Sequence, residues 1–187
     1  MPNVLKMVED MSQYKFFSTF DLKSAYHQIP IKPEDSKYTA FEVDGQLWEF
    51  TVIPFGVTNG VSAFQRTIDK VIHSEELKDT FAFVDNITVC GRTKEEHDRN
   101  VAAFMKLVKK YNFTLNEEQT VLSVENISVL GYTISHKKIT PDQDRLKPLL
   151  EMPPPSTLKA QKRIIGMFAY YSKLIQNYSE KNLSTKP

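Results

Sequence analysis

The sequence predicts an α+β fold, with a mainly antiparallel sheet and two helices on one face of it. Two strand-rich segments, residues 38–52 and 81–91, each hold a pair of turn-forming residues near the middle. Each segment is followed by apolar residues at helical spacing. Because 41% of the 187 residues are hydrophobic, the chain can bury one core without disulfides or a structural metal.

The first strands are predicted from aromatic and β-branched runs. Residues 16–20 read F-F-S-T-F and stop at Asp21, which predicts a buried strand that ends in a carboxylate. Within the first strand-rich segment, the dipeptide Asp44-Gly45 favours a two-residue turn, because glycine tolerates positive φ. We therefore expect a hairpin around this dipeptide.

A second hairpin is predicted in the other strand-rich segment. Asp85 and Asn86 lie between two β-rich arms, and both residue types tolerate turn conformations, so we expect them at its tip. Residues 121–124 and 127–134 are expected to form further strands. Gly131 interrupts the second of these, at a bulge or where another backbone approaches closely.

The two helices are predicted from periodicity. Apolar residues recur three and four positions apart over residues 61–72, and polar residues such as Gln65 alternate with them on the other face. Thr93 and Glu96 have the spacing of a capping box, and an apolar face continues from there to Tyr111. Both segments therefore read as amphipathic helices.

Prolines mark a boundary near residue 140. Pro141, Pro148 and the run at 153–155 stiffen the backbone and remove hydrogen-bond donors, so we expect a linker there. A helix is expected to follow it. One face of that helix carries a basic stripe of four cations with an embedded glycine, and its residues are Lys159, Lys162, Arg163, Gly166, Tyr170, Lys173 and Asn177.

Charge is distributed unevenly along the chain. Residues 1–144 carry 16 basic and 21 acidic side chains, whereas residues 145–187 carry 8 basic and 2 acidic ones. A basic tail on an acidic body indicates a polyanionic partner, although a solvated helix face has the same pattern. The single cysteine, Cys90, excludes zinc fingers and disulfide frameworks. No stretch resembles a membrane span or a secretory signal, so we expect an intracellular protein that is not secreted.

Two predicted strand ends carry carboxylates. If the strands containing Asp21 and Asp85 are neighbours in one sheet, the two side chains meet at one edge and can share hard cations such as Mg²⁺. Two such ions would suit phosphoryl transfer, because they stabilise both the attacking and the leaving oxygen. The pattern alone favours a plainer alternative, in which these residues only cap strands or form turns.

Six motifs occur in order along almost the whole chain. They are F-F-S-T-F-D-L-K-S-A-Y-H-Q-I-P-I from Phe16, T-A-F from Thr39, I-P-F-G-V-T-N-G-V-S-A-F-Q-R from Ile53, F-V-D-N-I-T-V from Phe83, V-L-G-Y-T-I-S from Val129 and I-G-M-F-A-Y-Y-S-K-L-I from Ile165. Together they resemble the reverse transcriptase of gypsy-type long-terminal-repeat retrotransposons. The resemblance implies a polymerase palm followed by a helical thumb segment, and RNA-directed DNA polymerisation by two-metal nucleotidyl transfer to a primer 3′-hydroxyl.

The resemblance also assigns the carboxylates. Asp21 would be the first metal-binding aspartate, with the Leu22 carbonyl on the same cation, and Asp85 the second. The hairpin of the family usually ends in Asp-Asp, whereas this chain has Asn86 in the last place. A unit charge about 4 Å from a cation contributes roughly 4 kcal/mol at an effective dielectric constant near 20. An amide carbonyl still ligates hard cations, so we expect Asp21, Asp85 and Asn86 to form the catalytic group, with two Mg²⁺ ions, or Mn²⁺, as cofactors.

By the same resemblance, Ser24, Ala25, Tyr26 and Phe55 would bind the nucleotide. The ring of Tyr26 would lie under the incoming sugar and clash with a 2′-hydroxyl, which favours deoxynucleotides. Phe55, between a proline and a glycine, would line the nucleotide pocket. The alternatives are an aromatic ring packed on the sheet at Tyr26 and a core side chain at Phe55.

The primer and template would contact two further regions. Leu130, Gly131 and Tyr132 match the hairpin that holds the primer terminus, where a glycine lets the nucleic-acid backbone approach closely. The basic stripe matches the start of the thumb. Phosphate contacts there would position the duplex without reading its sequence, through Lys159, Lys162, Arg163 and Lys173.

The expected organisation follows from this comparison. Residues 1–140 would be the palm, with the fingers largely missing at the N-terminus, and residues 141–187 a linker with part of the thumb or connection helices. The expected partners are a primed RNA or DNA template, deoxynucleoside triphosphates and the remaining parts of a Pol polyprotein, with no membrane. Reverse transcription would take place in cytoplasmic virus-like particles, with a possible nuclear phase. A non-catalytic relic that only binds nucleic acid is the alternative function.

Overall fold

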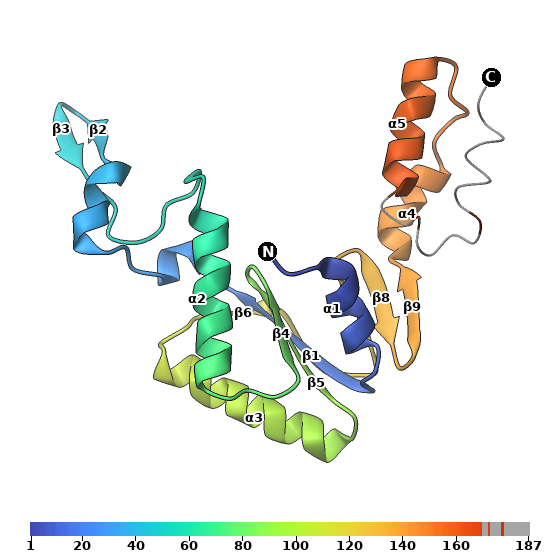
Figure 1. Cartoon of the computed structure of the whole chain (residues 1–187), viewed down its shortest axis with the longest axis horizontal. Helices are drawn as coiled ribbons and strands as arrows, with labels where there is room; N and C mark the ends of the chain where they lie inside the picture. The colour runs from blue at the N-terminus through green and yellow to red at the C-terminus, as the bar shows by residue number, and fades with distance from the viewer. Residues whose placement is uncertain (170–171, 173–176, 178–187) are drawn as a thin grey trace.

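A computed structural model describes residues 1–169, 172 and 177 of the chain. At its centre lies a four-stranded antiparallel sheet in the order β4-β5-β1-β6 (Figure 1). The expected antiparallel sheet is therefore confirmed. Its strands are β1 (Phe16–Leu22), β4 (Thr80–Phe83), β5 (Asn86–Gly91) and β6 (Leu115–Val124).

Two helices, α2 (Gly60–Ser74) and α3 (Lys94–Lys110), cover one face of this sheet, as predicted. They are amphipathic, and their buried side chains share a core with the inward residues of β1 and β5. The rings of Phe20 and Phe104 lie 4.7 Å apart in this core. At the start of α3, the Thr93 hydroxyl accepts the Glu96 N–H at 3.2 Å, so the predicted cap is present.

A further helix, α1 (Val4–Met11), packs against the opposite face of β1 and β5 and was not predicted. The Asn3 side chain caps it by accepting the Lys6 N–H at 3.2 Å. Its buried side chains join a second core, together with Phe17, Cys90 and the inward residues of a separate three-stranded sheet. The helix α1 was not predicted because its eight residues contain too few helical repeats for a periodic pattern to be recognised.

The first predicted hairpin is confirmed. β2 (Phe41–Val43) and β3 (Gln46–Trp48) pair across Asp44 and Gly45, which have φ values of 52° and 74°. Positive φ at both central residues is what such a short turn requires, and these two residue types tolerate it. The hairpin extends from two short 3₁₀ helices, η1 (Ala25–Gln28) and η2 (Pro33–Thr39).

The second predicted hairpin exists, but its tip was predicted wrongly. Phe83 pairs with Asn86, so the two turn residues are Val84 and Asp85, and Asn86 is the first residue of β5. Val84 has a φ of 54°. Sequence preference favoured Asp85 and Asn86 because valine is among the residues least tolerant of this conformation.

The segment 127–134 was predicted to be one strand, which is wrong. Leu130 and Gly131, with φ values of 55° and 82°, reverse the chain between two strands, so Gly131 lies in a turn and not at a bulge. β6 also begins earlier than the predicted residue 121. The separate sheet has the order β7-β8-β9, with strands β7 (Asn126–Val129), β8 (Tyr132–Ser135) and β9 (Lys138–Pro141).

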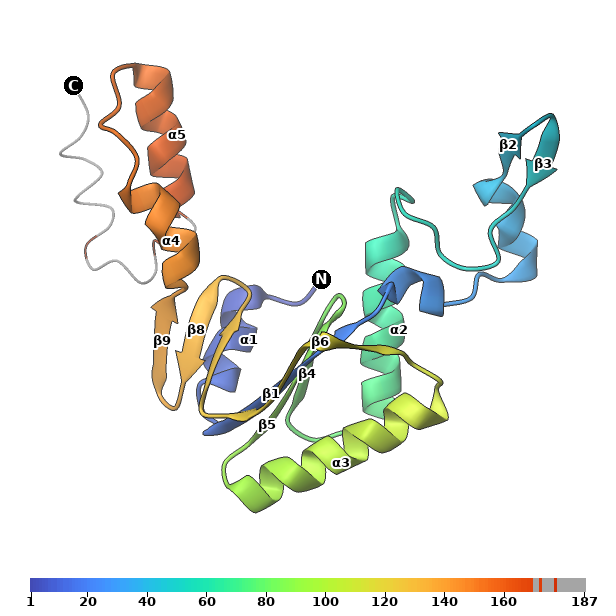
Figure 2. The same ribbon diagram turned by 180° about the vertical axis from the view of Figure 1, so that it is seen from behind.

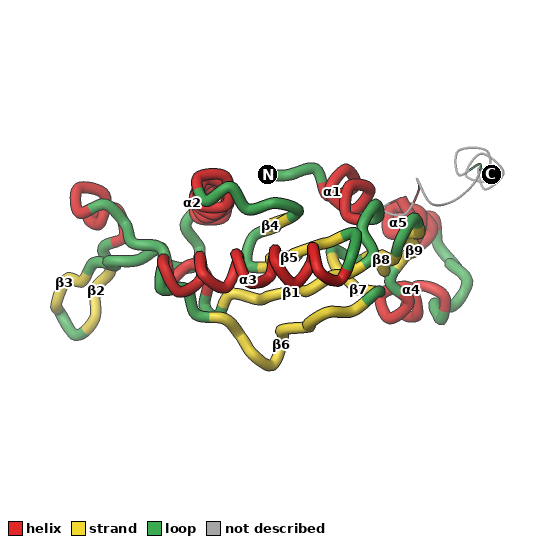
Figure 3. Tube along the Cα trace, turned by 90° about the horizontal axis from the view of Figure 1, so that it is seen from below, coloured by secondary structure: helices red, strands yellow, loops and turns green. Residues whose placement is uncertain are grey.

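The edge strand β6 departs from regular pairing next to Asp21. Its register with β1 passes from Thr19–Val121 to Asp21–Asn116, so residues 117–120 form a bulge. Figure 3 shows β6 bending away from β1 at this place. The bulge brings Asn116 beside Asp21, where its side chain can reach the carboxylate.

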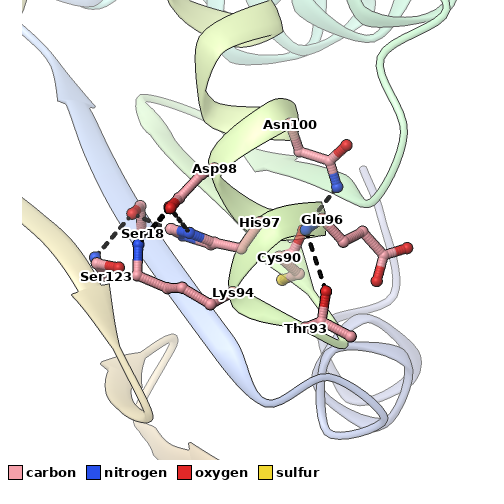
Figure 4. A network of polar contacts seen from close by, with 9 residues as sticks. All are labelled: Ser18, Cys90, Thr93, Lys94, Glu96, His97, Asp98, Asn100 and Ser123. Atoms are coloured by element: carbon pink, nitrogen blue, oxygen red, sulfur yellow. Dashed lines mark hydrogen bonds and ion pairs between the residues drawn. The ribbon is translucent and has the colours of Figure 1, made fainter.

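A polar network attaches α3 to β1 and β6 (Figure 4). His97 is buried, and its ring nitrogens lie 2.9 Å from Ser18 Oγ and 3.0 Å from Asp98 Oδ1. Ser18 Oγ also accepts the Ser123 N–H at 2.9 Å. Although Ser, His and Asp are adjacent as in a hydrolytic triad, Ser18 is fully buried between sheet and helix, so no substrate can reach it. The network therefore holds the irregular strand β6 in place.

Beyond β9, the predicted linker is partly helical. The Asp142 side chain caps α4 (Gln143–Leu150) by accepting the Asp144 N–H, and this helix continues past Pro148. α5 (Leu158–Ala169) follows the proline run and is the predicted basic helix. No helix in the described part of the chain is long and apolar enough to cross a membrane.

The molecule is elongated, with projections at both ends of the central sheet. Figures 1 and 2 show the β2–β3 hairpin at one end and α4 with α5 at the other, both extending to the same side. The turn between β4 and β5 points to that side as well and lies between the two projections. This turn, which carries Asp85, is therefore flanked by both.

Candidate functional site

Asp21 and Asp85 lie side by side at one end of the central sheet. Asp21 is near the end of β1, and in the pairing of β1 with β5 it lies opposite Asn86. The Leu22 N–H donates to the Asp85 carbonyl at 3.0 Å, which joins the strand end directly to the turn. The structure thus brings together the two carboxylates for which the sequence only suggested convergence.

The negative charges of this pair influence each other. The pKa of Asp21 is raised, first by burial and then by the negative charge of Asp85, while a hydrogen bond from Asn116 opposes the shift. Among the residues that the structure describes, neither carboxylate forms an ion pair. The site consequently has an excess of negative charge that a bound cation would neutralise.

The turn that carries Asp85 is strained. Val84, which precedes it, has a φ of 54°, a conformation that costs a β-branched residue on the order of 1–3 kcal/mol. Such a conformation persists only where surrounding contacts hold it. Asn86 follows at the start of β5, and its Nδ2 donates to Asp85 Oδ1 at 3.4 Å, so this amide faces the carboxylate pair.

Tyr26 lies next to the carboxylates. Burial and the charge of Asp85 raise the pKa of its phenol, so the hydroxyl lies within the field of that carboxylate. Its ring centroid is 5.6 Å from that of Phe55 and 5.4 Å from that of Phe64. Phe55 is 68% exposed, which excludes the core role weighed for it. The two aromatic rings therefore form a platform beside the acidic pair.

The other two predicted nucleotide residues differ in accessibility. Ser24 is exposed and has a φ of 49°, whereas Ala25 is buried in the first core, so only its backbone is available to a ligand. The side chain of Gln28 anchors this segment: it accepts the Thr114 N–H at 2.8 Å and donates to the Thr114 carbonyl at 3.0 Å. Sequence reasoning did not identify Gln28, since its partner lies 86 residues away.

The turn between β7 and β8 faces the same site. An open pocket of about 590 Å³ lies between it and the β4–β5 turn. Gly131 and Tyr132 are buried, and Tyr132 belongs to the second core, so the side chain of Tyr132 is not accessible to a ligand. The pocket is lined by Val4, Phe83, Val84, Asp85, Asn86, Ser128, Val129, Leu130 and Arg145.

Arg145 was not singled out from the sequence. It lies on α4, which the prolines made look like a linker, and so no periodic pattern drew attention to it. It is exposed and forms no ion pair with any described residue. Among the described residues that line this pocket it is the only cation, and it is placed to meet an anion there.

The predicted basic stripe is present on α5 for the residues that are described. Lys159, Lys162 and Arg163 are exposed on this helix. Lys173, the fourth predicted member, lies outside the described residues. The three described cations belong to the projection formed by α4 and α5 (Figure 2).

The donors at the site fit hard cations in type. Two partly buried carboxylates, a neighbouring amide and backbone carbonyls offer only oxygen, which Mg²⁺ and Mn²⁺ prefer. Within the described residues, no group of three or more His, Cys, Asp or Glu side chains could hold a metal ion on its own. The arrangement therefore suits a cation that takes its remaining ligands from water or from a phosphate-bearing substrate.

This combination of an antiparallel sheet, two helices on one face and a carboxylate pair at a hairpin is the arrangement expected for a polymerase palm. The sequence pattern of the family described as reverse transcriptase (RNA-dependent DNA polymerase) matches residues 2–134. The chain therefore belongs to the reverse transcriptase family.

Relatives among well-characterised proteins are retrotransposon polyproteins. The chain is 32% identical over 180 residues to the retrovirus-related Pol polyprotein from transposon opus of Drosophila melanogaster. It is 30% identical over 179 residues to the corresponding polyprotein from transposon gypsy of the same organism. Each alignment covers 96% of this chain but only 18% and 17% of the respective relative, so the chain spans less than a fifth of their length.

Solved structures support the fold. The foamy viral protease-reverse transcriptase in complex with double-stranded DNA superposes with a TM-score of 0.85 over 96% of this chain and 31% of that one, at 21% identity. The same viral protein with an RNA/DNA hybrid gives a TM-score of 0.78 over 91% of this chain and 23% of that one, at 20% identity. The predicted α+β palm fold is thus confirmed.

Proposed function

We propose that this chain carries the polymerisation centre of an RNA-directed DNA polymerase within a retrotransposon Pol polyprotein. One observation supports this most strongly: Asp21 and Asp85, far apart in sequence, lie together in a member of the reverse transcriptase family, and no described residue pairs with them as a cation. Such a pair is unfavourable in a free protein and favourable once cations bind. Nucleotidyl transfer from a deoxynucleoside triphosphate to a primer 3′-hydroxyl is the reaction.

In this proposal, Asp21, Asp85 and the Leu22 carbonyl would hold two Mg²⁺ ions, which Mn²⁺ could replace. When bound, such ions would lower the pKa of the attacking hydroxyl and stabilise the leaving pyrophosphate. Asn86 orients Asp85 through its side-chain amide. The protein itself supplies position and charge, and little covalent chemistry.

The nucleotide would bind over the aromatic platform. Tyr26 lies between the carboxylates and Phe55, where its ring can contact a deoxyribose and exclude a 2′-hydroxyl. Ser24 and the backbone of Ala25 adjoin it at the start of η1. Phe55 is exposed and lines the outer side of the platform.

The primer strand would enter through the open pocket. The Leu130–Gly131 turn would support its terminus, with Tyr132 fixing that turn from the second core. Arg145, Lys159, Lys162 and Arg163 would contact phosphates along the duplex, and Lys173 is assigned to the same role from the sequence. Contacts of this kind make binding steeply dependent on salt.

The organisation of the chain is part of the proposal. Residues 1–140 would form the palm and residues 141–187 the linker and thumb, as the sequence predicted, although β9 ends at Pro141 and α4 already occupies part of the linker. A primed RNA or DNA template and the remainder of the polyprotein would be its partners. Reverse transcription would take place in an intracellular particle.

The test is primer extension on an RNA template with the full chain. We expect Mg²⁺-dependent incorporation that Asp21→Asn abolishes, while Asn86→Asp maintains or increases it. Binding of the duplex should persist in all three proteins, because the phosphate contacts lie elsewhere. Duplex binding without incorporation, in both the parent and Asn86→Asp, would instead identify the non-catalytic relic.

A further inference from the structure

A buried amide connects α2 to the turn that carries Asp85. Gln65 lies on α2 and is 2% exposed, although the sequence placed it on the polar face of that helix. Its Oε1 accepts the Val84 N–H at 2.7 Å. Its Nε2 donates to the Ala82 carbonyl at 3.0 Å and to Asp69 Oδ1 at 2.8 Å. Every polar atom of this side chain is therefore engaged.

These contacts lie at the turn end of the hairpin, where the pairing of β4 with β5 stops. Phe83 and Asn86 are the last pair of the β4–β5 ladder, so the N–H of Val84 has no partner across the strands. Val84 is also the strained residue of the turn, with its φ of 54°. Gln65 accepts that N–H and donates to the Ala82 carbonyl two residues earlier. One side chain therefore bonds to the backbone on both sides of Phe83.

The consequence extends to the neighbouring carboxylate. Asp85 directly follows Val84, and its backbone carbonyl accepts the Leu22 N–H from β1. With the turn held by Gln65 on one side and by β1 on the other, the backbone that carries Asp85 has one position relative to Asp21. A site that must bring two like charges together needs such outside support, because their repulsion drives them apart.

We propose that Gln65 is a positioning residue, which holds the Val84–Asp85 turn in its strained conformation and thereby sets the affinity of the carboxylate pair for a divalent cation. This inference rests on the proposed function. A glutamine is required because a glutamate could accept from Val84 but could not donate to Ala82. It would also add a negative charge beside Asp69.

Two variants separate positioning from mere stability. Gln65→Leu removes both bonds to the hairpin at similar volume, and Gln65→Glu keeps only the acceptor. Ile68→Val is the matched control, since Ile68 lies on the same helix, is equally buried at 2% and belongs to the first hydrophobic core. Its deletion of one methylene lowers stability without touching the turn.

The first measurement is amide hydrogen exchange of the full chain by NMR. In the parent, the Val84 N–H should exchange slowly, and Gln65→Leu should accelerate it about tenfold beyond the change in neighbouring strand amides. Ile68→Val should change all of these amides together. Unaltered protection of Val84 in Gln65→Leu would overturn the proposal.

The second measurement is Mn²⁺ binding, followed by electron paramagnetic resonance. Gln65→Leu and Gln65→Glu should each weaken binding about tenfold, while Ile68→Val leaves it unchanged. If the parent binds Mn²⁺ and Gln65→Leu binds it equally well, the inference is wrong although the proposed function stands. If Asp21→Asn binds Mn²⁺ as tightly as the parent, the proposed metal site is wrong, and the link between Gln65 and a cation is wrong with it.

Discussion

Two hairpins of this chain have two-residue turns of opposite character. The β2–β3 turn consists of Asp44 and Gly45, whose φ values of 52° and 74° suit these residue types, and it is exposed at the tip of a projection. The β4–β5 turn consists of Val84 and Asp85, and a β-branched residue there holds a φ of 54°. The first turn forms from its own preferences. The second is bonded to Gln65 and β1, so contacts from distant segments hold a conformation that its own residues disfavour.

The largest expected difference between the two turns concerns activity. Asp85→Asn removes one of two unit charges near the cations, which at about 4 Å and an effective dielectric constant near 20 is worth roughly 4 kcal/mol, or on the order of a thousandfold in incorporation rate. Asp44→Asn, the matched change in the other turn, should leave the rate unaltered. Mg²⁺-dependent primer extension compares them. Equal rates for both variants would contradict the assignment of the site to the β4–β5 turn.

A second prediction tests the role of local preference. Gly45→Val should lower the free energy of unfolding by about 1–2 kcal/mol, because it imposes on the exposed turn the strain that Val84 has without any supporting side chain. Apart from the residue itself and its chain neighbours, no described atom lies within 4 Å of the added Cβ, so the loss would come from the backbone. Gly45→Asn is the control, since asparagine tolerates positive φ. Urea denaturation measures both, and equal stability of the two variants would argue against this account.

Without bound cations, the acidic pair should lower the free energy of unfolding. Because the pKa of Asp21 is raised in the folded chain, the folded state binds a proton more tightly than the unfolded state does. Proton binding to Asp21 therefore stabilises the folded state below the pKa of Asp21 in the unfolded chain. This stabilisation is lost as pH rises through the pKa of Asp21 in the folded chain. Asp21→Asn should therefore increase the free energy of unfolding at neutral pH by about 0.5–1 kcal/mol.

This prediction is checked by denaturation of both proteins from acidic to neutral pH without divalent cations. The difference in stability between variant and parent should grow as pH rises and then become constant. Added Mg²⁺ should reduce it by stabilising the parent. A difference that shrinks with rising pH would show that Asp21 is not disfavoured in its ionised form.

The last prediction concerns the pocket between the β4–β5 and β7–β8 turns, where the expected effect is far smaller than that at Asp85. Arg145→Gln should weaken binding of a primer–template duplex about threefold to tenfold and reduce the slope of log K against log salt by about one. Arg92→Gln is the control, because Arg92 follows the end of β5 that is remote from the β4–β5 turn and lies over the ring of Tyr14. Fluorescence anisotropy over a salt series measures both. An unchanged slope in Arg145→Gln would remove this residue from the proposed interface.

The sequence by itself determined the elements with strong periodicity or turn chemistry. The α2 and α3 helices, the Asp44-Gly45 turn and the aromatic strand that carries Asp21 all follow from local patterns that the structure confirms, although β1 ends at Leu22 and not at Asp21. The family could also be identified, because six ordered motifs are more specific than any local preference. These features were predictable since each is encoded in neighbouring residues.

Only the tertiary structure decided how the site is assembled. The strand order β4-β5-β1-β6 brings Asp21 next to Asp85. The turn between β4 and β5 contains Val84 and not Asn86, and a buried glutamine from α2 accepts the Val84 N–H. Arg145 lines the pocket beside the site from α4, a helix that was not predicted because prolines lie in and around it. The physical reason is the same in each case: contacts between distant segments outweigh local preferences of about 1 kcal/mol, and no pattern within a single segment records them.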